Sequence, residues 1–195
     1  MGKGEATRET ILDAASRLAR TVGLSGMTIG TLAASTELSK SGLYAHFRSK
    51  EALQLQVLEH AKGRFVAEVV SPALAAARGE PRVRALFDAK LRWNAQPGGC
   101  IFTSSAMELD DRPGPVRDRV VRDQRDWLDT LATVFHTGRT EGHFRADADP
   151  EQFAFELDGI MFSYHSFKRL LGDETAEARA RRAFETLLDS VREAR

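Results

Sequence analysis

The sequence predicts an all-α fold of about nine helices, and three observations support this. Ala, Leu, Arg and Glu dominate the 195 residues, whereas Val, Ile and Pro are sparse, and this composition favours helices. Apolar residues recur at helical spacing along most of the chain, and no stretch shows the alternation that marks a strand. With 42% hydrophobic and 29% charged residues, the composition is that of a globular protein with a sizeable core.

Three short helices are expected within the first 50 residues, followed by the start of a fourth. The apolar residues of 7–22 lie at helical spacing, and Gly23 follows where a left-handed residue commonly closes a helix. Thr28, Ser39 and Ser49 have the hydroxyl groups of N-cap residues, which accept hydrogen bonds from free N–H groups of the first turn. We therefore expect the second, third and fourth helices to begin directly after these residues.

The remaining chain is also predicted to be helical. A long helix over 50–70 is expected to end or kink at Ser71-Pro72, because proline lacks an N–H group and restricts the residue before it. The helix over 150–171 has too many apolar residues for a single stripe, which predicts burial on two sides. The other helices are expected over 73–78, 81–95, 100–109, 116–140 and 174–194.

Cysteine content and hydropathy exclude several classes of protein. Cys100 is the single cysteine, so the chain can form no internal disulfide and no cysteine-rich metal cage. The chain has neither a long apolar run nor the apolar core of a signal peptide, so we expect a soluble cytoplasmic protein without a membrane span. Residues 1–50 hold seven basic and four acidic residues, a net charge of +3 that balances −3 in the remainder. A basic N-terminal end is compatible with nucleic-acid binding.

The two short helices within residues 28–50 have the spacing of a helix-turn-helix. The second helix is small and polar on its outward side, which would let its backbone approach base edges in the DNA major groove. Nearby hydroxyl, ring and cationic groups are of the kind that bind phosphates. The candidate DNA-binding residues are Thr28, Ser39, Lys40, Ser41, Gly42, Tyr44, His46 and Lys50. The alternative is that the hydroxyls are only caps, that Tyr44 packs on the first helix and that His46 binds a local carbonyl group.

This segment resembles the DNA-binding domain of the tetracycline-repressor (TetR) family of bacterial regulators. The match covers about residues 6–60, and its most specific part is Leu43-Tyr44-Ala45-His46-Phe47 followed by Lys50-Glu51. The resemblance implies a homodimer in which the helix over 39–46 enters the major groove of each half-operator. It places Lys40, Ser41 and Gly42 nearest the base edges, and Thr28, Ser39, Tyr44, His46 and Lys50 on phosphates. The family often has Gly in the turn where this chain has Glu37, which leaves two alternatives, a different turn or a Glu37 side chain directed away from DNA.

The C-terminal part matches the family in length and helical order, and the resemblance implies that it binds a small molecule. Aromatic residues could line an apolar cavity there, and polar or soft groups lie within apolar stretches. The candidate ligand-binding residues are Trp93, Cys100, Phe102, Trp127, Phe135, His136, Asp158, Phe162 and His165. Each aromatic residue is also a candidate for the core, and Cys100 is either a redox sensor or a small buried hydrophobe. The histidines and Asp158 have no metal-ligand spacing, so we expect neither a metal nor a cofactor.

The sequence therefore predicts a ligand-responsive, DNA-binding transcriptional regulator that acts as a repressor on a palindromic operator, with an unidentified small-molecule effector. Residues 1–50 would form the DNA-binding domain, the helix over 50–70 a connector, and residues 51–195 the ligand-binding and dimerisation domain. Two copies are expected to pair through the helices over 150–171 and 174–194. Two alternatives stay open. One is a helical-bundle enzyme, although no Glu-x-x-His pair, nucleophile motif or phosphate loop is present. The other is a dimeric adaptor that no longer binds DNA, which an acidic surface around residues 39–50 would favour.

Overall fold

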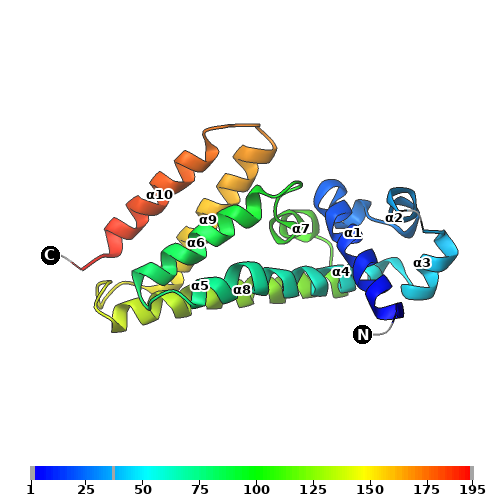
Figure 1. Cartoon of the computed structure of the whole chain (residues 1–195). Coiled ribbons are helices and arrows are strands. Elements are labelled where there is room, and N and C mark those ends of the chain that lie inside the picture. Colours follow the sequence, from blue (N-terminus) through cyan, green and yellow to red (C-terminus); the bar gives the residue numbers. More distant parts are fainter. Residues whose placement is uncertain (1–2, 37, 194–195) are drawn as a thin grey trace. The chain divides into compact units, whose positions relative to one another are not determined.

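The computed structural model describes residues 3–36 and 38–193, with side chains from residue 7 onward, and these residues are mainly helical (Figure 1). In chain order the elements are α1 (Lys3–Gly26), α2 (Ile29–Ser35), α3 (Lys40–His46), α4 (Lys50–Phe65), the π-helical turn η1 (Val66–Val70), α5 (Ser71–Leu74), α6 (Glu80–Ala95), α7 (Ile101–Leu109), α8 (Pro115–Thr140), α9 (Pro150–Arg169) and α10 (Ala176–Val191). Counting α4, η1 and α5 as one continuous helix gives nine helices in the described part of the chain, so the predicted all-α fold is confirmed. None of the helices in these two ranges is long and apolar enough to span a membrane.

The helices form two compact units. Unit 1 contains the described residues of Met1–Arg64 and Pro97–Asp123, and unit 2 contains Phe65–Gln96 and the described residues of Gln124–Arg195. Unit 1 therefore holds α1, α2, α3, nearly all of α4, α7 and the first part of α8. Although α7 is distant from α1 in the sequence, the two helices pack together within unit 1.

One face of α1 supplies much of the core of unit 1. The buried positions Ile11, Ala15 and Ala19 follow one another at intervals of four residues. The sequence pattern also predicts Leu18 and Val22 on the apolar face of this helix, and for Val22 the prediction was wrong, since this residue is 44% exposed. The next position of the series is Gly23, where α1 breaks, so Val22 lies on another side of the helix. Other fully buried side chains of unit 1 include Leu24, Met27, Leu32, Leu43, Phe47, Leu53 and Leu58.

All three predicted N-caps are present. Each hydroxyl oxygen accepts a hydrogen bond from the backbone N–H group three residues later, at 3.0 Å for Thr28, 3.1 Å for Ser39 and 3.0 Å for Ser49. A cap of this kind contributes about 1 kcal/mol to the stability of its helix. Because α2 and α3 have only seven residues each, the caps are a large part of what keeps them helical.

Pro72 disturbs the long helix without stopping it at once. The preceding residues form the π-helical turn η1, in which the Ser71 N–H group reaches back to the Val66 carbonyl. The wider turn accommodates the proline, which would otherwise clash with the carbonyl four residues earlier. The helical segment expected over 73–78 was wrong, because α5 ends at Leu74 and turns follow. The later predicted helices agree with the observed bounds to within three residues.

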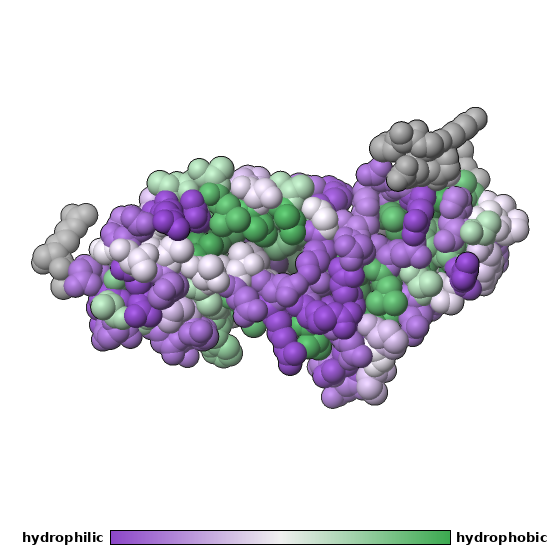
Figure 2. Space-filling view, turned by 90° about the horizontal axis from the view of Figure 1, so that it is seen from below, coloured by the Kyte–Doolittle hydropathy of each residue, from purple (hydrophilic) through white to green (hydrophobic). Residues whose placement is uncertain are grey.

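Unit 2 is held together by aromatic stacking and by the packing of α9 along α10. Phe87 of α6 stacks on Phe184 of α10 with ring centroids 3.9 Å apart. Phe135 of α8 stacks on Phe144 at 4.5 Å and on Phe153 of α9 at 4.2 Å. Hydrophobic residues also reach the surface, and Figure 2 shows a patch of them on unit 2.

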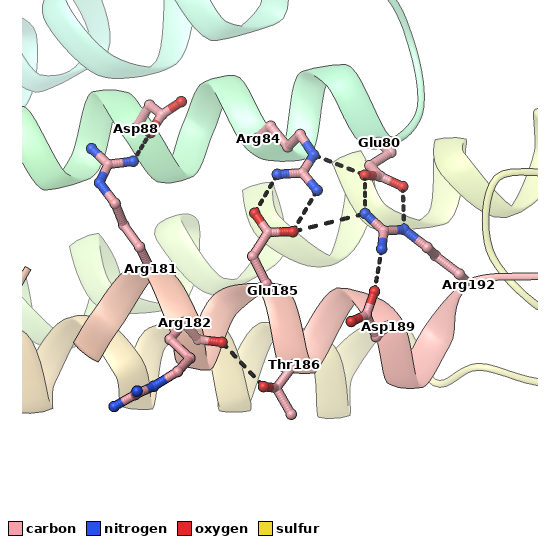
Figure 3. Close-up of polar contacts among 9 residues, drawn as sticks. All are labelled: Glu80, Arg84, Asp88, Arg181, Arg182, Glu185, Thr186, Asp189 and Arg192. Carbon is pink, nitrogen blue, oxygen red and sulfur yellow. Dashed lines mark hydrogen bonds and ion pairs between the residues drawn. The ribbon is translucent and has the colours of Figure 1, made fainter. Parts of the chain in front are cut away.

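A chain of ion pairs joins α6 to α10 (Figure 3). Arg192 donates two hydrogen bonds to Glu80, at 2.9 Å from Nε and 2.6 Å from Nη2. Arg84 donates to the same carboxylate from Nε at 2.8 Å, and from its other two nitrogens to Glu185 at 2.6 and 2.7 Å. The hydrogen bond from Arg192, followed by that from Arg84, lowers the pKa of the Glu80 carboxyl group from 4.5 to about 2.

The first prediction concerns this ion-pair chain. Glu80→Gln should lower the free energy of unfolding at pH 7 by about 1–3 kcal/mol, because it leaves two guanidinium groups without their shared carboxylate. The pKa of Glu80 is lower in the folded state, so its contribution is complete above pH 4.5 and is lost as the pH falls towards 2. Urea denaturation at pH 7 and pH 3 should show the variant's deficit shrinking at the lower pH. The control is Glu193→Gln, which neutralises an exposed carboxylate next to Arg192. An equal deficit for both variants would contradict the prediction.

Candidate nucleic-acid interface and effector site

The helix pair α2–α3 in unit 1 forms the candidate nucleic-acid interface. At the start of α2, Thr28 and Thr31 form a capping box. The Thr31 N–H group donates to Thr28 Oγ1 at 3.0 Å, and the Thr28 N–H group donates to Thr31 Oγ1 at 2.8 Å. The sequence identified Thr28 alone, although a hydroxyl three residues after an N-cap is a recognisable signal for its partner. The sequence left open whether Glu37 changes the turn between α2 and α3 or points away from DNA. Glu37 lies outside the described residues.

The outward face of α3 is polar and exposed. Leu43 is the one residue that α3 buries, while Lys40, Ser41, Gly42 and Tyr44 are all exposed. Tyr44 is 57% exposed, so more than half of its surface is available to another molecule. The small residues Ser41 and Gly42 in the first turn of α3 leave its backbone open to close approach by another molecule.

Basic side chains surround this face. Lys40, Arg48 and Lys50 are exposed, and residues 39–50 include no acidic residue, which favours DNA binding over the alternative of an adaptor with an acidic surface. A shallow hollow of about 440 Å³ is lined by residues that include Arg8, His46 and Arg48. Arg8 and Arg48 were missed by the sequence reasoning, although their charge was the available signal. Cationic groups around a hollow of this kind suit a phosphate.

Lys50 has a contact that the sequence did not predict. Its Nζ donates a hydrogen bond to the backbone carbonyl of Ser25, near the end of α1. A lysine ammonium group has three donors, so this bond leaves two for other acceptors. The structure thus places Lys50 where α4 begins and ties it to the segment that precedes α2.

The candidate effector site lies in the interior of unit 2. Trp127 Nε1 donates to Asp158 Oδ1 at 3.0 Å, and Gln124 Nε2 donates to Asp158 Oδ2 at 2.7 Å. The ammonium group of Lys90, which is only 4% exposed, lies 5.0 Å from the centroid of the Phe65 ring and 5.2 Å from that of Trp127. A buried carboxylate, a buried cation and aromatic faces are therefore gathered in one place.

Burial sets the charge states here. Burial raises the pKa of Asp158, against the opposing effects of the Lys90 charge and of the hydrogen bonds from Trp127 and Gln124. Burial, helped by the positive charges of Arg169 and Lys90, lowers the pKa of His165 from 6.5 to about 4. His165 is therefore neutral at pH 7 and can offer both a donor and an acceptor nitrogen.

Asn94 is the most unusual polar group of this interior. It is 3% exposed, and neither its side-chain oxygen nor its nitrogen has a hydrogen-bond partner among the residues that the structure describes. It lies one turn after Lys90 on α6, so both residues lie on the same side of that helix. An unsatisfied buried amide costs about 1–3 kcal/mol, and a polar ligand that bonded to it would offset this cost.

The structure gathers some, but not all, of the predicted ligand-binding residues. Trp93, Trp127, Asp158 and His165 are buried in unit 2, and the Trp93 and Trp127 rings both meet Phe65 edge-on at 5.3 and 5.2 Å. Phe135 belongs to the separate stack with Phe144 and Phe153, His136 is exposed, and Phe162 is half-buried. Cys100 and Phe102 are buried within unit 1. Sequence reasoning missed Phe65, Lys90, Asn94 and Gln124, because no motif distinguishes them from ordinary helix residues. Within the described ranges, no three His, Cys, Asp or Glu residues are placed to hold a metal ion.

Comparison with known proteins identifies both parts of the chain. Residues 11–57 match the family model "Bacterial regulatory proteins, tetR family", and residues 79–184 match "Tetracyclin repressor-like, C-terminal domain". The HTH-type transcriptional repressor DhaR of Mycobacterium sp. (strain GP1) is 28% identical over 137 residues, which cover 68% of this chain and 67% of DhaR. A TetR transcriptional regulator from Chloroflexus aurantiacus J-10-FL is 30% identical with a TM-score of 0.85, and the match covers 100% of both chains. A TetR-family regulator from Cytophaga hutchinsonii has a TM-score of 0.87 at 20% identity, covering 100% of this chain and 99% of that chain.

The second prediction concerns the buried amide. Asn94→Leu keeps the branched shape but removes both unsatisfied polar atoms, so the free energy of unfolding of the unliganded protein should rise by about 1–2 kcal/mol. Urea denaturation measures this change. The comparison variant is Gln124→Leu, which removes a donor to Asp158 and should destabilise the protein. A loss of stability in Asn94→Leu would show that the amide is satisfied in the folded protein.

Proposed function

The chain belongs to the tetracycline-repressor family of bacterial DNA-binding regulators, and from this premise we propose that two copies bind a palindromic operator through α2 and α3 and release it when a small molecule binds unit 2. The protein is a transcriptional repressor and not an enzyme. The observation that carries the proposal is the exposed polar face of α3, which is anchored from behind by Leu43.

In the proposed complex α3 lies in the major groove, and its contacts divide into two kinds. Lys40, Ser41 and Gly42, in the first turn of α3, approach the base edges. The residues proposed to bind phosphates are Thr28, Ser39, Tyr44, His46 and Lys50, together with Arg8 and Arg48. Residues 1–50 would then form the DNA-binding domain and residues 51–195 the part that binds the effector and dimerises. A protein that works on DNA in this way acts in the cytoplasm of a bacterium.

The proposed dimer contact is the outer side of α9 and α10. A groove of about 620 Å³ runs between these helices, and its lining is mainly apolar and small, with Gly159, Ala176, Ala180 and Ala183 among its residues. Several large apolar side chains on and just beyond α9 are exposed, including Phe155 at 71% and Phe167 at 39%. The inner sides of α9 and α10 face the core of unit 2, through residues such as Phe153, Leu157 and Phe184. Burial on two sides, which the sequence predicted for 150–171, would be completed by the same helices of a second copy.

The proposed effector is a small molecule with polar hydrogen-bonding groups on an aromatic or otherwise apolar body. Asn94 offers one donor pair and one acceptor, Lys90 and Asp158 supply opposite charges, and Phe65, Trp93 and Trp127 supply ring surfaces. A structure of the same fold, AibR, was determined in complex with isovaleryl coenzyme A and operator DNA. It is 24% identical to this chain, has a TM-score of 0.74, and the match covers 93% of this chain and 98% of AibR.

The third prediction tests the division of DNA contacts. Lys40→Ala should weaken binding to a DNA site selected from a random library by about 1–3 kcal/mol and reduce discrimination between bases. Tyr44→Phe should weaken binding by about 1 kcal/mol whatever the sequence, because it removes one phosphate hydrogen bond. Fluorescence anisotropy over a salt series measures both effects. Lys168→Ala, which removes an exposed lysine of α9, is the control. Affinities equal to that of the unaltered protein for both variants would refute this assignment of α3.

The fourth prediction tests the dimer. Ala183→Arg places a long cation in the apolar groove of α9 and α10, so it should produce a monomer that binds operator DNA much more weakly, since two half-sites are no longer bound together. Light scattering after gel filtration measures the mass. The matched control is Ala178→Arg, an exposed position of α10 that does not line the groove, and this variant should remain dimeric. If both variants had the mass of a dimer, the interface would lie elsewhere.

A further inference from the structure

The end of α1 contains a break that is held by a carboxylate from α7. At Gly23 the backbone leaves the helical conformation, with φ 77° and ψ 165°. The two N–H groups that follow are bound by Glu108, whose Oε2 accepts from Leu24 at 2.9 Å and whose Oε1 accepts from Ser25 at 2.6 Å. In an unbroken helix these N–H groups would bond to carbonyls one turn earlier. Glu108 therefore replaces backbone bonds that the break removes.

The carbonyl groups of the same two residues are also bound by side chains. Gln54 of α4 donates from Nε2 to the Leu24 carbonyl at 2.6 Å, and Lys50 donates from Nζ to the Ser25 carbonyl. Arg112, just after α7, donates to the Ser25 hydroxyl at 3.0 Å. The backbone N–H and carbonyl groups of both residues are thus held by donors and acceptors from α4 and from the α7 region. We call this set of contacts around Leu24 and Ser25 the α1 clamp.

The clamp needs glycine at its centre. A Cβ atom at residue 23 would lie 2.8 Å from Glu108 Oε2, closer than such atoms approach, and a φ of 77° is strained for other residues. α7 also approaches α1 near its own start. A Cβ atom on Gly98, shortly before α7, would lie 2.5 Å from the Cβ atom of Arg20. Both ends of α7 are therefore fitted against α1, and α7 has a fixed position within unit 1.

The clamp sets where the helix-turn-helix begins. Leu24 and Met27 are fully buried, and Thr28, the N-cap of α2, follows Ser25 after two residues. Thr31 also donates to the Gly26 carbonyl at 3.3 Å, which links α2 back to the same segment. The direction in which the chain enters α2 is therefore determined by groups that Glu108 and its neighbours hold. Charge-assisted hydrogen bonds of this kind are about twice as strong as neutral ones.

We propose that Glu108 is a positioning residue for operator binding, because its carboxylate holds the break in α1 and thereby the orientation of α2 and α3. The proposal rests on the proposed DNA-binding function, and it adds a residue far outside the first 50 to that function. Glu108 itself touches no DNA. Lys40 and Tyr44, by contrast, are proposed to contact DNA directly, and a direct and an indirect role have different effects on binding.

The test is the variant Glu108→Gln in the full-length protein, with a DNA site selected from a random library by the unaltered protein. The amide keeps the shape but presents an N–H₂ group to one of the two backbone donors, so one bond is lost. Operator affinity should fall about tenfold. The slope of affinity against salt should stay unchanged because no phosphate contact is removed. Binding to unrelated DNA should also stay unchanged, since it depends on charge. In NMR spectra the amide protons of Leu24 and Ser25 should move upfield.

Glu59→Gln is the matched control, since it neutralises another glutamate of unit 1 that is 71% exposed, and it should leave operator affinity unchanged. If Glu108→Gln is too unstable for the assay, Arg112→Gln gives the milder test. It removes a hydrogen bond to the Ser25 hydroxyl and leaves every backbone group bonded, so operator affinity should fall about threefold.

Three outcomes would overturn the proposal. Unchanged operator affinity in Glu108→Gln, or in Arg112→Gln where that variant replaces it, would do so directly. So would an equal loss of affinity for the operator and for unrelated DNA in a variant that stays folded, as would unshifted amide protons. Failure of the unaltered protein to select any DNA site would instead refute the proposed DNA-binding function.

Discussion

A helix that binds DNA bases must leave its outward face free of contacts with its own protein, and α3, which we propose for this role, meets this constraint within unit 1. α3 has seven residues and buries only Leu43, which is far too little apolar area to stabilise a helix by packing alone. Its ends supply the rest: the Ser39 hydroxyl caps the start, and the fully buried Phe47 closes the end. The capping box of α2 has the same role one helix earlier. Small, well-capped helices are therefore what allows the outward face to stay polar and exposed.

The same constraint explains why α7 is part of unit 1. Three helices with a small core are marginally stable, so the orientation of α2 and α3 depends on neighbours outside the first 50 residues. α4 supplies Gln54 and Lys50, and α7 supplies Glu108, all to the short segment after Gly23. A change in the position of α7 would therefore alter the backbone that leads into α2. No interface residue would have to change for DNA binding to be affected.

The limits of sequence reasoning follow from how far each contact reaches along the chain. The three N-caps were predictable, because each is an interaction between a hydroxyl and an N–H group three residues away. The special conformation of Gly23 was also predictable, since it marks a helix end. Its partner Glu108 was not, because 83 to 85 residues separate them and no local pattern distinguishes this glutamate from others. Likewise Trp127 and Asp158 were candidates, but Lys90 and Asn94 became recognisable only from their burial. His136 and Phe135 were also candidates but lie outside this group. Helical spacing assigns residues to one face of a helix, but it does not determine which other element packs against that face.

The core of unit 2 contains buried charged and polar groups whose desolvation lowers its stability. Asp158 is 9% exposed, Lys90 4% and Asn94 3%, and apolar residues of similar volume would satisfy the same packing without desolvating charges or an amide. The raised pKa of Asp158 and the lowered pKa of His165 both record that desolvation. The ion pairs of Glu80, Arg84 and Arg192 stabilise the same unit where the groups remain partly hydrated, so they incur less of this penalty. A protein selected only for stability would place its charges in partly hydrated ion pairs of this kind, and not in the core. Polar groups on the proposed effector would offset this cost by bonding to the buried set, whereas a ligand that is apolar throughout would leave the cost uncompensated.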